Sequence, residues 1–303
     1  MILVVGSATE PMVSHVYDEL ERRGSTAFLI DVRDMPSTVG FSLSPPGQDP
    51  GDRLCLEDGT TINLRKVKAI YQRIGFGNFE AFEGYSEAEV NFVSQECQSA
   101  WLPILNSWPS LVVNRPVHSG SNASKPFQIG LFEEYGFRVP LTLVTNNPKA
   151  ARAFYDEHEG RVIYKSISYT RSIVQGMDSH DLERLDTLVN CPVQLQERIE
   201  GNDMRVHVVG DRVFASRIVA ESSDYRYDKE ARVEAWQLPS EIEERCVALA
   251  RGLGLALTGI DLRHTPDGDY VCFEANPSPA FSWYEARTEQ PITAALCDLL
   301  EEA

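Results

Sequence analysis

Asp261 and Glu274 are the residues best placed to do chemistry, because the segment 259–276 has the pattern of a β-hairpin. If the Asp267-Gly268 dipeptide forms the two-residue turn that it favours, Asp261 faces Glu274 across the two strands. Facing side chains have Cβ atoms roughly 4.5 to 5.5 Å apart, and two like charges so placed destabilise a sheet unless something compensates. A divalent cation would compensate for them.

Asn276 adds a neutral oxygen ligand to this pair. It lies two residues beyond Glu274, so its side chain points to the same face, roughly 7 Å along the strand. Two carboxylates and an amide suit Mg²⁺, which usually keeps several waters and takes further ligands from substrate phosphates. The alternative interpretation is an acidic hairpin face that is only solvated, so the rest of the chain has to decide between the two.

The composition restricts the class of protein. The chain has 303 residues, 43% of them hydrophobic, and no apolar run long enough to span a bilayer, so we expect a soluble protein of about two domains. Six cysteines form no close pair, which argues against a zinc ribbon or a redox motif and favours a reducing cytoplasm. The net charge of −17 argues against duplex nucleic acid and anionic membranes as partners, but it is compatible with ATP in a locally basic cleft.

The elements that must position these residues fall into three blocks. In the first block, strand and helix patterns alternate, which predicts a small parallel α/β domain. A loop or an excursion between strands is predicted at 40–60, where Pro, Gly and Asp are frequent, and Ser86 with Glu89 predicts a capping box before a long helix. The alternating patterns of the first block lie at 2–5, 11–23, 26–30 and 69–73.

The second and third blocks supply the remaining helices and strands. The second begins near Ser124 with a helix that ends at Gly136. The third is mostly strands, and Ser240 with Glu243 predicts a capping box for its helix. The other predicted elements are strands at 138–144, 161–167 and 193–199, a hairpin at 204–218, and helices from Asn147 and Pro291.

Lys165 stands inside an apolar strand pattern, where a charged side chain needs a partner. The alternative is an edge-strand lysine whose long side chain reaches solvent. The sequence contains no P-loop, no Gly-x-Ser-x-Gly elbow and no His-Glu-x-x-His pair, so these catalytic classes are excluded.

An ordered set of residues resembles the ATP-grasp superfamily, most closely its RimK-like branch of carboxylate-amine ligases. The segments 201–213 and 273–279 look like that branch's signature segments. The segments 224–227 and 283–285 are similar to those of the graspetide synthetases, which crosslink ribosomally made peptides through ω-ester or ω-amide bonds. The resemblance covers about residues 110 to 300 well and the rest loosely. The ordered set is Lys125, Lys165, Gln196-Glu197-Arg198-Ile199, Asp203, Arg217, Asp261 and Glu274-Ala275-Asn276.

The resemblance implies an α/β protein with the ATP-grasp fold in three parts. An N-terminal parallel α/β domain, the pre-ATP-grasp domain, is expected at 1–117. A central α+β lid is expected at 118–190, and a C-terminal α+β domain with an antiparallel sheet at 191–303. The implied cofactors are ATP and Mg²⁺, with two magnesium ions bound and Mn²⁺ able to substitute.

The resemblance also implies how the nucleotide is held. Lys125 and Lys165 match the lysines that reach the α and β phosphates, and Lys165 thereby gains its partner. Gln196 matches the position that meets the adenine amino group, and Asp203 matches the ribose position. The backbone of Glu197, Arg198 and Ile199 matches the hinge strand that reads the edge of the base.

The resemblance also implies which residues bind the metal and the γ-phosphate. Asp261, Glu274 and Asn276 match the magnesium ligands, the same site that the hairpin register indicates. Arg217 matches a γ-phosphate contact and, with Lys165, is expected to be catalytic. The segment 168–172 lacks the glycines usual in the family's phosphate-covering loop, so Arg171 or the loop backbone is expected to contact phosphate.

Arg205 and Arg217 fall on opposite faces if the turn at 210–211 has two residues, because Arg205 would then face Ser216. We therefore predict Arg217 for ATP and assign Arg205 a structural or substrate-facing position. Arg73, which follows a strand, is the candidate anchor for a substrate carboxylate; the alternative is a surface arginine.

The predicted reaction is ligation through an acyl phosphate, with a carboxylate activated by ATP and then attacked by an amine or a hydroxyl. A peptide substrate is preferred to a small carboxylate or amine such as a free amino acid. Three alternatives remain: an amino-acid ligase, a small-molecule kinase, and a nucleotide-binding protein without turnover. No nucleic acid and no membrane are expected as partners, a homodimer is left open, and the predicted location is the cytoplasm.

Overall fold

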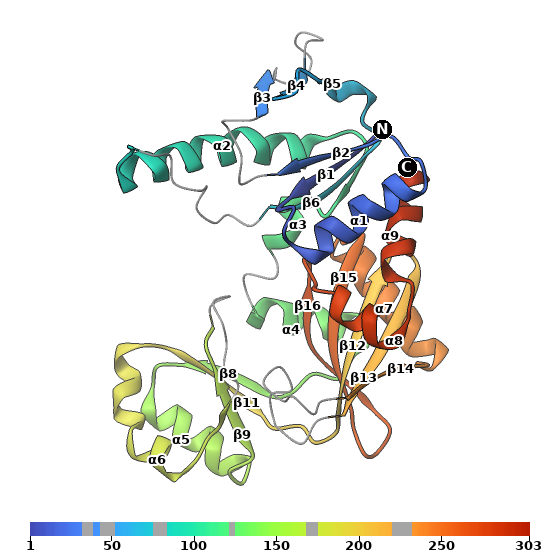
Figure 1. The fold of residues 1–303 in the computed structure, drawn as a ribbon. Coiled ribbons are helices and arrows are strands. Elements are labelled where there is room, and N and C mark those ends of the chain that lie inside the picture. The colour runs from blue at the N-terminus through green and yellow to red at the C-terminus, as the bar shows by residue number, and fades with distance from the viewer. Residues whose placement is uncertain (32–38, 43–51, 75–83, 121–124, 168–174, 220–231) are drawn as a thin grey trace.

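The computed structural model describes residues 1–31, 39–42, 52–74, 84–120, 125–167, 175–219 and 232–303. In the described part, strands form a parallel sheet near the N-terminus, a lid sheet, a C-terminal sheet and a small three-stranded sheet (Figure 1). This arrangement confirms the predicted mixed α/β architecture of one parallel and several antiparallel sheets.

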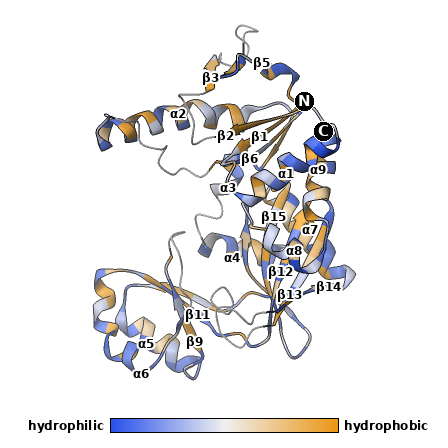
Figure 2. Cartoon of the chain, in the orientation of Figure 1, coloured by the Kyte–Doolittle hydropathy of each residue, from blue (hydrophilic) through white to orange (hydrophobic). Residues whose placement is uncertain are grey.

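The N-terminal sheet is parallel, as predicted, with strand order β2-β1-β6-β7. Its strands are hydrophobic, which Figure 2 shows for β1 and β2, and all five residues of β1 are buried. The capping box of Ser86 and Glu89 is present at the start of α2. The elements are β1 (Ile2–Gly6), α1 (Pro11–Arg22), β2 (Ala27–Asp31), β6 (Ala69–Arg73), α2 (Glu87–Ser107), β7 (Leu111–Val113) and α3 (Pro116–Ser119).

Of the two alternatives predicted for 40–60, the loop is wrong and the excursion between strands is correct, because this region contributes two strands of an antiparallel sheet. The strands are short, and β3 and β4 are joined through 43–51, outside the described residues, so no long alternating pattern marks them. They are β3 (Val39–Ser42), β4 (Arg53–Leu56) and β5 (Thr61–Asn63), followed by the 3₁₀ turn η1 (Leu64–Lys66).

The lid sheet has the order β10-β9-β11-β8, and its helices pack against one face of it. Leu195, Val162 and Ala151 are buried between that face and the helices. Strand β11 pairs with β8 and β9, so the lid sheet extends past the predicted boundary at 190. The elements are β8 (Thr142–Thr145), α5 (Pro148–Glu157), β9 (Val162–Lys165), β10 (Gln175–Gly176), α6 (Ser179–Glu183), η3 (Leu185–Asn190) and β11 (Val193–Glu197).

The C-terminal sheet is antiparallel with the order β14-β13-β12-β15-β16. One face packs against α7 and the end of α4, where Phe132, Leu249 and Ile260 share a core. The predicted capping box of Ser240 is wrong, because α7 begins one residue earlier and Pro239 is its N-cap. The elements are α4 (Lys125–Glu134), β12 (Asn202–Val209), β13 (Arg212–Val219), β14 (Arg232–Trp236), α7 (Ser240–Gly252), β15 (Leu257–His264), β16 (Tyr270–Asn276), α8 (Ser282–Thr288) and α9 (Ile292–Glu301).

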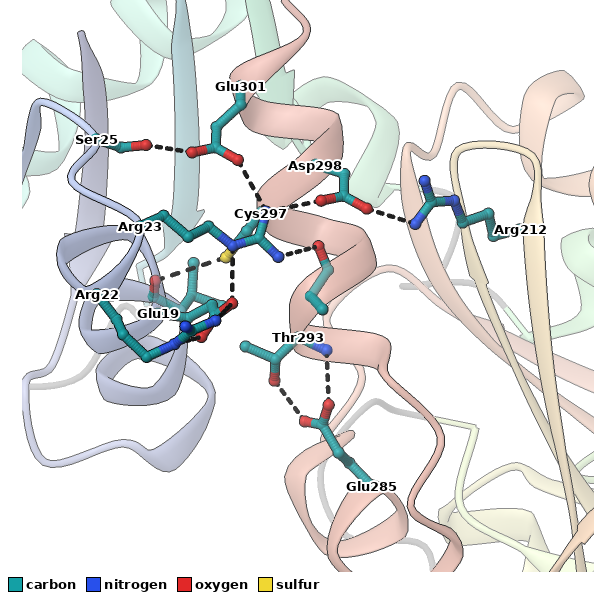
Figure 3. A network of polar contacts seen from close by, with 12 residues as sticks. Glu19, Arg22, Arg23, Ser25, Arg212, Glu285, Thr293, Cys297, Asp298 and Glu301 are labelled. Atoms are coloured by element: carbon teal, nitrogen blue, oxygen red, sulfur yellow. Dashed lines mark hydrogen bonds and ion pairs between the residues drawn. The ribbon is translucent and has the colours of Figure 1, made fainter.

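Two contacts fix the N-terminal sheet to the C-terminal sheet. Asn114, after β7, donates from Nδ2 to the carbonyl oxygens of Leu257 and Pro277 at 2.5 and 2.6 Å, and its Oδ1 accepts from the Leu257 N–H at 3.1 Å. Arg23, at the end of α1, bonds Asp298 and Glu301 of α9 (Figure 3). The Asn114 contacts and the ion pairs between α1 and α9 therefore hold the C-terminal domain in a fixed position relative to the N-terminal domain.

No helix in the described ranges has the length and the apolar character that crossing a bilayer requires.

Candidate nucleotide and metal site

Asp261 and Glu274 face each other across β15 and β16, as the sequence predicts. The predicted two-residue turn is wrong, however. Thr265 pairs with Asp269 through a backbone hydrogen bond of 3.0 Å, which leaves a three-residue loop that ends on Gly268 with φ +88°. A bulge between Asp261 and Leu262 then shifts the register back. Two departures from the simple hairpin cancel, so the facing pair is correct although the turn is not.

The surroundings of Glu274 fit a divalent cation. Burial and the neighbouring Asp261 charge raise the pKa of Glu274, whereas Lys125, Arg205 and Lys165 act in the opposite direction. A cation between the two carboxylates would relieve both the burial penalty and the like-charge repulsion. The donor set is therefore one that Mg²⁺ accepts, provided that waters and phosphate oxygens complete it.

Asn276 faces Gly259, one pair further along the same face of the sheet. Its Oδ1 accepts from the Ser278 N–H at 2.8 Å, which fixes the orientation of the amide. Among the described residues no group of three or more His, Cys, Asp or Glu side chains is placed to hold a metal. The two carboxylates with the Asn276 amide remain the predicted ligands.

Arg205 lies on the face of the acidic pair, whereas Arg217 lies on the opposite face. The predicted pairing of Arg205 with Ser216 is present, and Arg205 also faces Asp261, to which its Nη1 donates at 2.6 Å. Arg217 faces Met204, a core residue, and its Nε donates to Glu234 at 2.5 Å. The geometry therefore favours Arg205 as the arginine at the metal end, contrary to the choice of Arg217 from the sequence.

Lys165 and Lys125 converge electrostatically on the acidic pair. Lys165 is buried, and its Nζ donates to Oε1 of Gln196 at 3.1 Å. Burial, followed by the charge of Lys125, lowers the pKa of Lys165 from 10.5 to about 8, and Glu274 and Asp261 act in the opposite direction. Because the ammonium groups of Lys165 on β9 and Lys125 on α4 interact with two carboxylates of the C-terminal sheet, these side chains together have the charges that a metal-bound polyphosphate needs.

The residues predicted to bind the base and the ribose already have partners within the protein. Gln196 is fully buried, and its Nε2 donates to Oγ1 of Thr142 at 3.0 Å. Asp203 accepts from Nε of Arg263 at 3.0 Å, and the same guanidinium donates to the carbonyl oxygen of Ile199 at 2.8 Å. The neighbouring Arg198 N–H donates to the Arg161 carbonyl oxygen at 2.9 Å. The nucleotide contacts of these residues remain predictions, as does that of Glu197.

Arg73 is the predicted substrate anchor, and it is mostly buried at the end of β6. Its Nε donates to Glu10 at 2.7 Å, and its Nη1 donates to the Pro279 carbonyl oxygen at 3.0 Å. Arg73 is thus not the surface arginine of the alternative interpretation. The guanidinium reaches the segment that follows Asn276, so a role near the substrate remains a prediction.

Two residues that the sequence analysis did not single out position this site. Gln128, one turn after Lys125 on α4, is buried and bonds Ala275, donating to its carbonyl oxygen at 2.9 Å and accepting from its N–H at 3.4 Å. A Cβ at Gly259 would lie 2.3 Å from Nη2 of Arg205, so any other residue there would displace the guanidinium from its present position. The detectable signal was a glutamine on an otherwise apolar helix segment.

Other predicted features lie elsewhere or outside the described residues. The segment 168–172 with Arg171, and the segment 224–227, are outside them. In the segment 283–285, Glu285 accepts from the Thr293 N–H at 2.9 Å and therefore links α8 to α9 (Figure 3). The guanidinium of Arg287 stacks on Trp283 at 4.1 Å from the ring centre.

Comparison with known proteins identifies the class. The family model of the RimK-like ATP-grasp domain matches residues 125–300. The probable alpha-L-glutamate ligase 1 of Shewanella denitrificans is 31% identical over 203 residues, which cover 63% of this chain and 68% of that protein.

Solved structures agree over the whole chain. The ATP-grasp ligase PsnB, complexed with a minimal precursor, Mg and ADP, is 31% identical with a TM-score of 0.84, covering 99% of this chain and 96% of that one. The macrocyclase MdnC from Microcystis aeruginosa, bound with the precursor peptide MdnA, has a TM-score of 0.87 over 100% of both chains; at 24% identity it shows the shared fold.

The fold and the family match define an ATP-grasp protein. Because the family model covers more than half of the chain, the chain belongs to the RimK-like ATP-grasp family, and it is an ATP-grasp ligase. ATP and Mg²⁺, the predicted cofactors, are those that ATP-grasp enzymes use.

Proposed function

We propose that this protein joins a carboxylate of a peptide to an amine or a hydroxyl, using ATP and Mg²⁺ and passing through an acyl phosphate. The observation that carries the proposal is the convergence of the buried Lys125 and Lys165 on the facing pair Asp261 and Glu274, with which they interact electrostatically. Two ammonium groups suit phosphate oxygens, and two carboxylates suit the metal that phosphates bind.

The residues of the chain would divide this work between them. Asp261, Glu274 and Asn276 would hold Mg²⁺, which neutralises phosphate charge when bound. Lys125 and Lys165 would orient the phosphates, and Arg205, fixed by Asp261, supplies a further positive charge at the same end.

The chemistry needs no covalent nucleophile from the protein. An oxygen of the substrate carboxylate attacks the γ-phosphorus, the bond to the bridging oxygen breaks, and ADP leaves. The amine or hydroxyl then attacks the acyl carbon, loses its proton, and expels phosphate. The lid sheet and its buried Lys165 would keep water from the acyl phosphate, because a hydrolysed intermediate wastes the ATP.

A peptide is the proposed substrate because the solved relatives PsnB and MdnC were captured with precursor peptides, and PsnB shares 31% identity over nearly the whole chain. A second candidate is the addition of glutamate, because several curated relatives are named probable alpha-L-glutamate ligases. We also propose a cytoplasmic location, since all six cysteines are unpaired.

The test incubates the protein with Mg·ATP, hydroxylamine and either a precursor-type peptide rich in Asp, Glu, Ser and Lys or free glutamate with an acceptor peptide. A ligase yields ADP and a hydroxamate of the carboxylate substrate, because hydroxylamine captures an acyl phosphate. Hydroxamate on the precursor-type peptide supports the proposal, and hydroxamate on free glutamate supports the second candidate. A phosphorylated substrate without hydroxamate would show a kinase instead.

A further inference from the structure

Gln194 is a buried amide that the protein itself does not satisfy. It lies on β11 with 0% of its surface exposed, and neither its Oε1 nor its Nε2 has a hydrogen-bond partner within the described part of the chain. Buried polar side-chain atoms are nearly always hydrogen-bonded, so an orphaned donor and acceptor together need an explanation.

The sheet register fixes the direction in which Gln194 points. Gln194 faces Lys165 on β9 and Val144 on β8, and side chains that face each other share one side of a sheet. Gln196, two residues later, points the same way and accepts from Lys165. The other side of the sheet holds Leu195 against the lid helices. Gln194 therefore lies on the face that looks toward the acidic pair.

The neighbouring amide shows what Gln194 lacks. Gln196 has both its oxygen and its nitrogen engaged, by Lys165 and by Thr142. Gln194 stands two residues earlier on the strand, directly opposite the lysine whose charge interacts with Lys125, Asp261 and Glu274. An unsatisfied N–H₂ group beside a buried cation suits a ligand that is anionic and rich in acceptors.

We propose that Gln194 is a nucleotide-binding residue whose amide nitrogen, Nε2, donates to the phosphate groups of ATP or ADP beside Lys165. This inference rests on the proposed function. The amide nitrogen donates to phosphate oxygen, which lessens the desolvation penalty that the residue carries without ligand. Gln194 thus complements the charge of Lys165 with a neutral donor.

The test measures binding of Mg·ADP by calorimetry and thermal stability without nucleotide for wild type, Gln194→Met and Gln175→Met. Methionine keeps the length of the side chain but removes both polar atoms. Gln175 is the matched control, because it pairs with Tyr164 on the same sheet but points to the opposite side. Gln194→Glu is a second variant that keeps the size and adds a negative charge.

We expect Gln194→Met to weaken Mg·ADP binding roughly five- to tenfold while leaving the nucleotide-free protein as stable as wild type or more so. Gln194→Glu should weaken binding further, and Gln175→Met should leave it unchanged. If wild type binds Mg·ADP and both Gln194 variants bind equally well, the inference is wrong and a buried water satisfies the amide. If wild type itself does not bind Mg·ADP, the proposed function fails instead.

Discussion

Lys165 gives the sharpest prediction about stability, because its ammonium group is buried at a cost. The pKa of Lys165 falls from 10.5 to about 8, and each pKa unit corresponds to about 1.4 kcal/mol, so the charged form is destabilised by about 3 kcal/mol in the folded state. Lys165→Met removes that cost, but it leaves Oε1 of Gln196 without its donor, a loss of about 1 to 3 kcal/mol. Near pH 7 we therefore expect the variant to unfold with about the free energy of wild type or up to about 2 kcal/mol more.

The pH dependence separates this reasoning from a simple packing effect. Between about pH 8 and 10.5 the folded wild type has released the Lys165 proton while the unfolded chain still holds it, so wild-type stability rises with pH. The variant has no such group. We would measure urea unfolding of both proteins at pH 7 and pH 9.5. The difference between their free energies of unfolding should shift by about 2 kcal/mol in favour of wild type from the lower to the higher pH. A difference that does not change with pH, or that shifts the other way, would refute the argument.

Four further substitutions test the positioning of the site. Gly259→Ala places a Cβ against the Arg205 guanidinium, so we expect about 1 to 3 kcal/mol less stability in urea unfolding; wild-type stability would contradict the close approach. Gln128→Leu leaves the backbone N–H and carbonyl of Ala275 without their side-chain partner, so it should lower the free energy of unfolding by about 1 to 3 kcal/mol and weaken Mg·ADP binding in calorimetry. Unchanged values would show that the two hydrogen bonds between Gln128 and Ala275 are dispensable. Arg205→Ala should weaken Mg·ATP binding in calorimetry at least roughly tenfold and Arg217→Ala by less than about twofold, and the reverse order in the same assay would restore the choice made from the sequence.

The hairpin shows how far local patterns can reach. The Asp-Gly dipeptide and the alternation of the strands identified Asp261 and Glu274 as a facing pair, which the structure confirms. The loop has three residues and not two, and the error was absorbed by the bulge after Asp261. No sequence signal marks that bulge, which is seen only in the register of the paired strands.

Longer-range features were harder to predict for a physical reason. The pairing of Arg205 with Ser216 was predicted correctly, but which face of the sheet carries the candidate site depends on which face α7 covers. The membership of β11 in the lid sheet depends likewise on strand partners distant in sequence. The position of Gln194 could have been predicted from the sequence, since strand alternation places it on the same face as Gln196. Its missing partners become visible only when burial is known.

The most direct test of the central claim is calorimetric titration of ATP with and without Mg²⁺ into wild type, Asp261→Asn and Glu274→Gln. The account predicts that wild type binds ATP in a magnesium-dependent way, and that both substitutions sharply weaken binding or abolish the magnesium dependence, because each removes a charged ligand from the facing pair. Magnesium-dependent binding that is equal in all three proteins would mean that the pair is a solvated acidic face and that the metal site lies elsewhere.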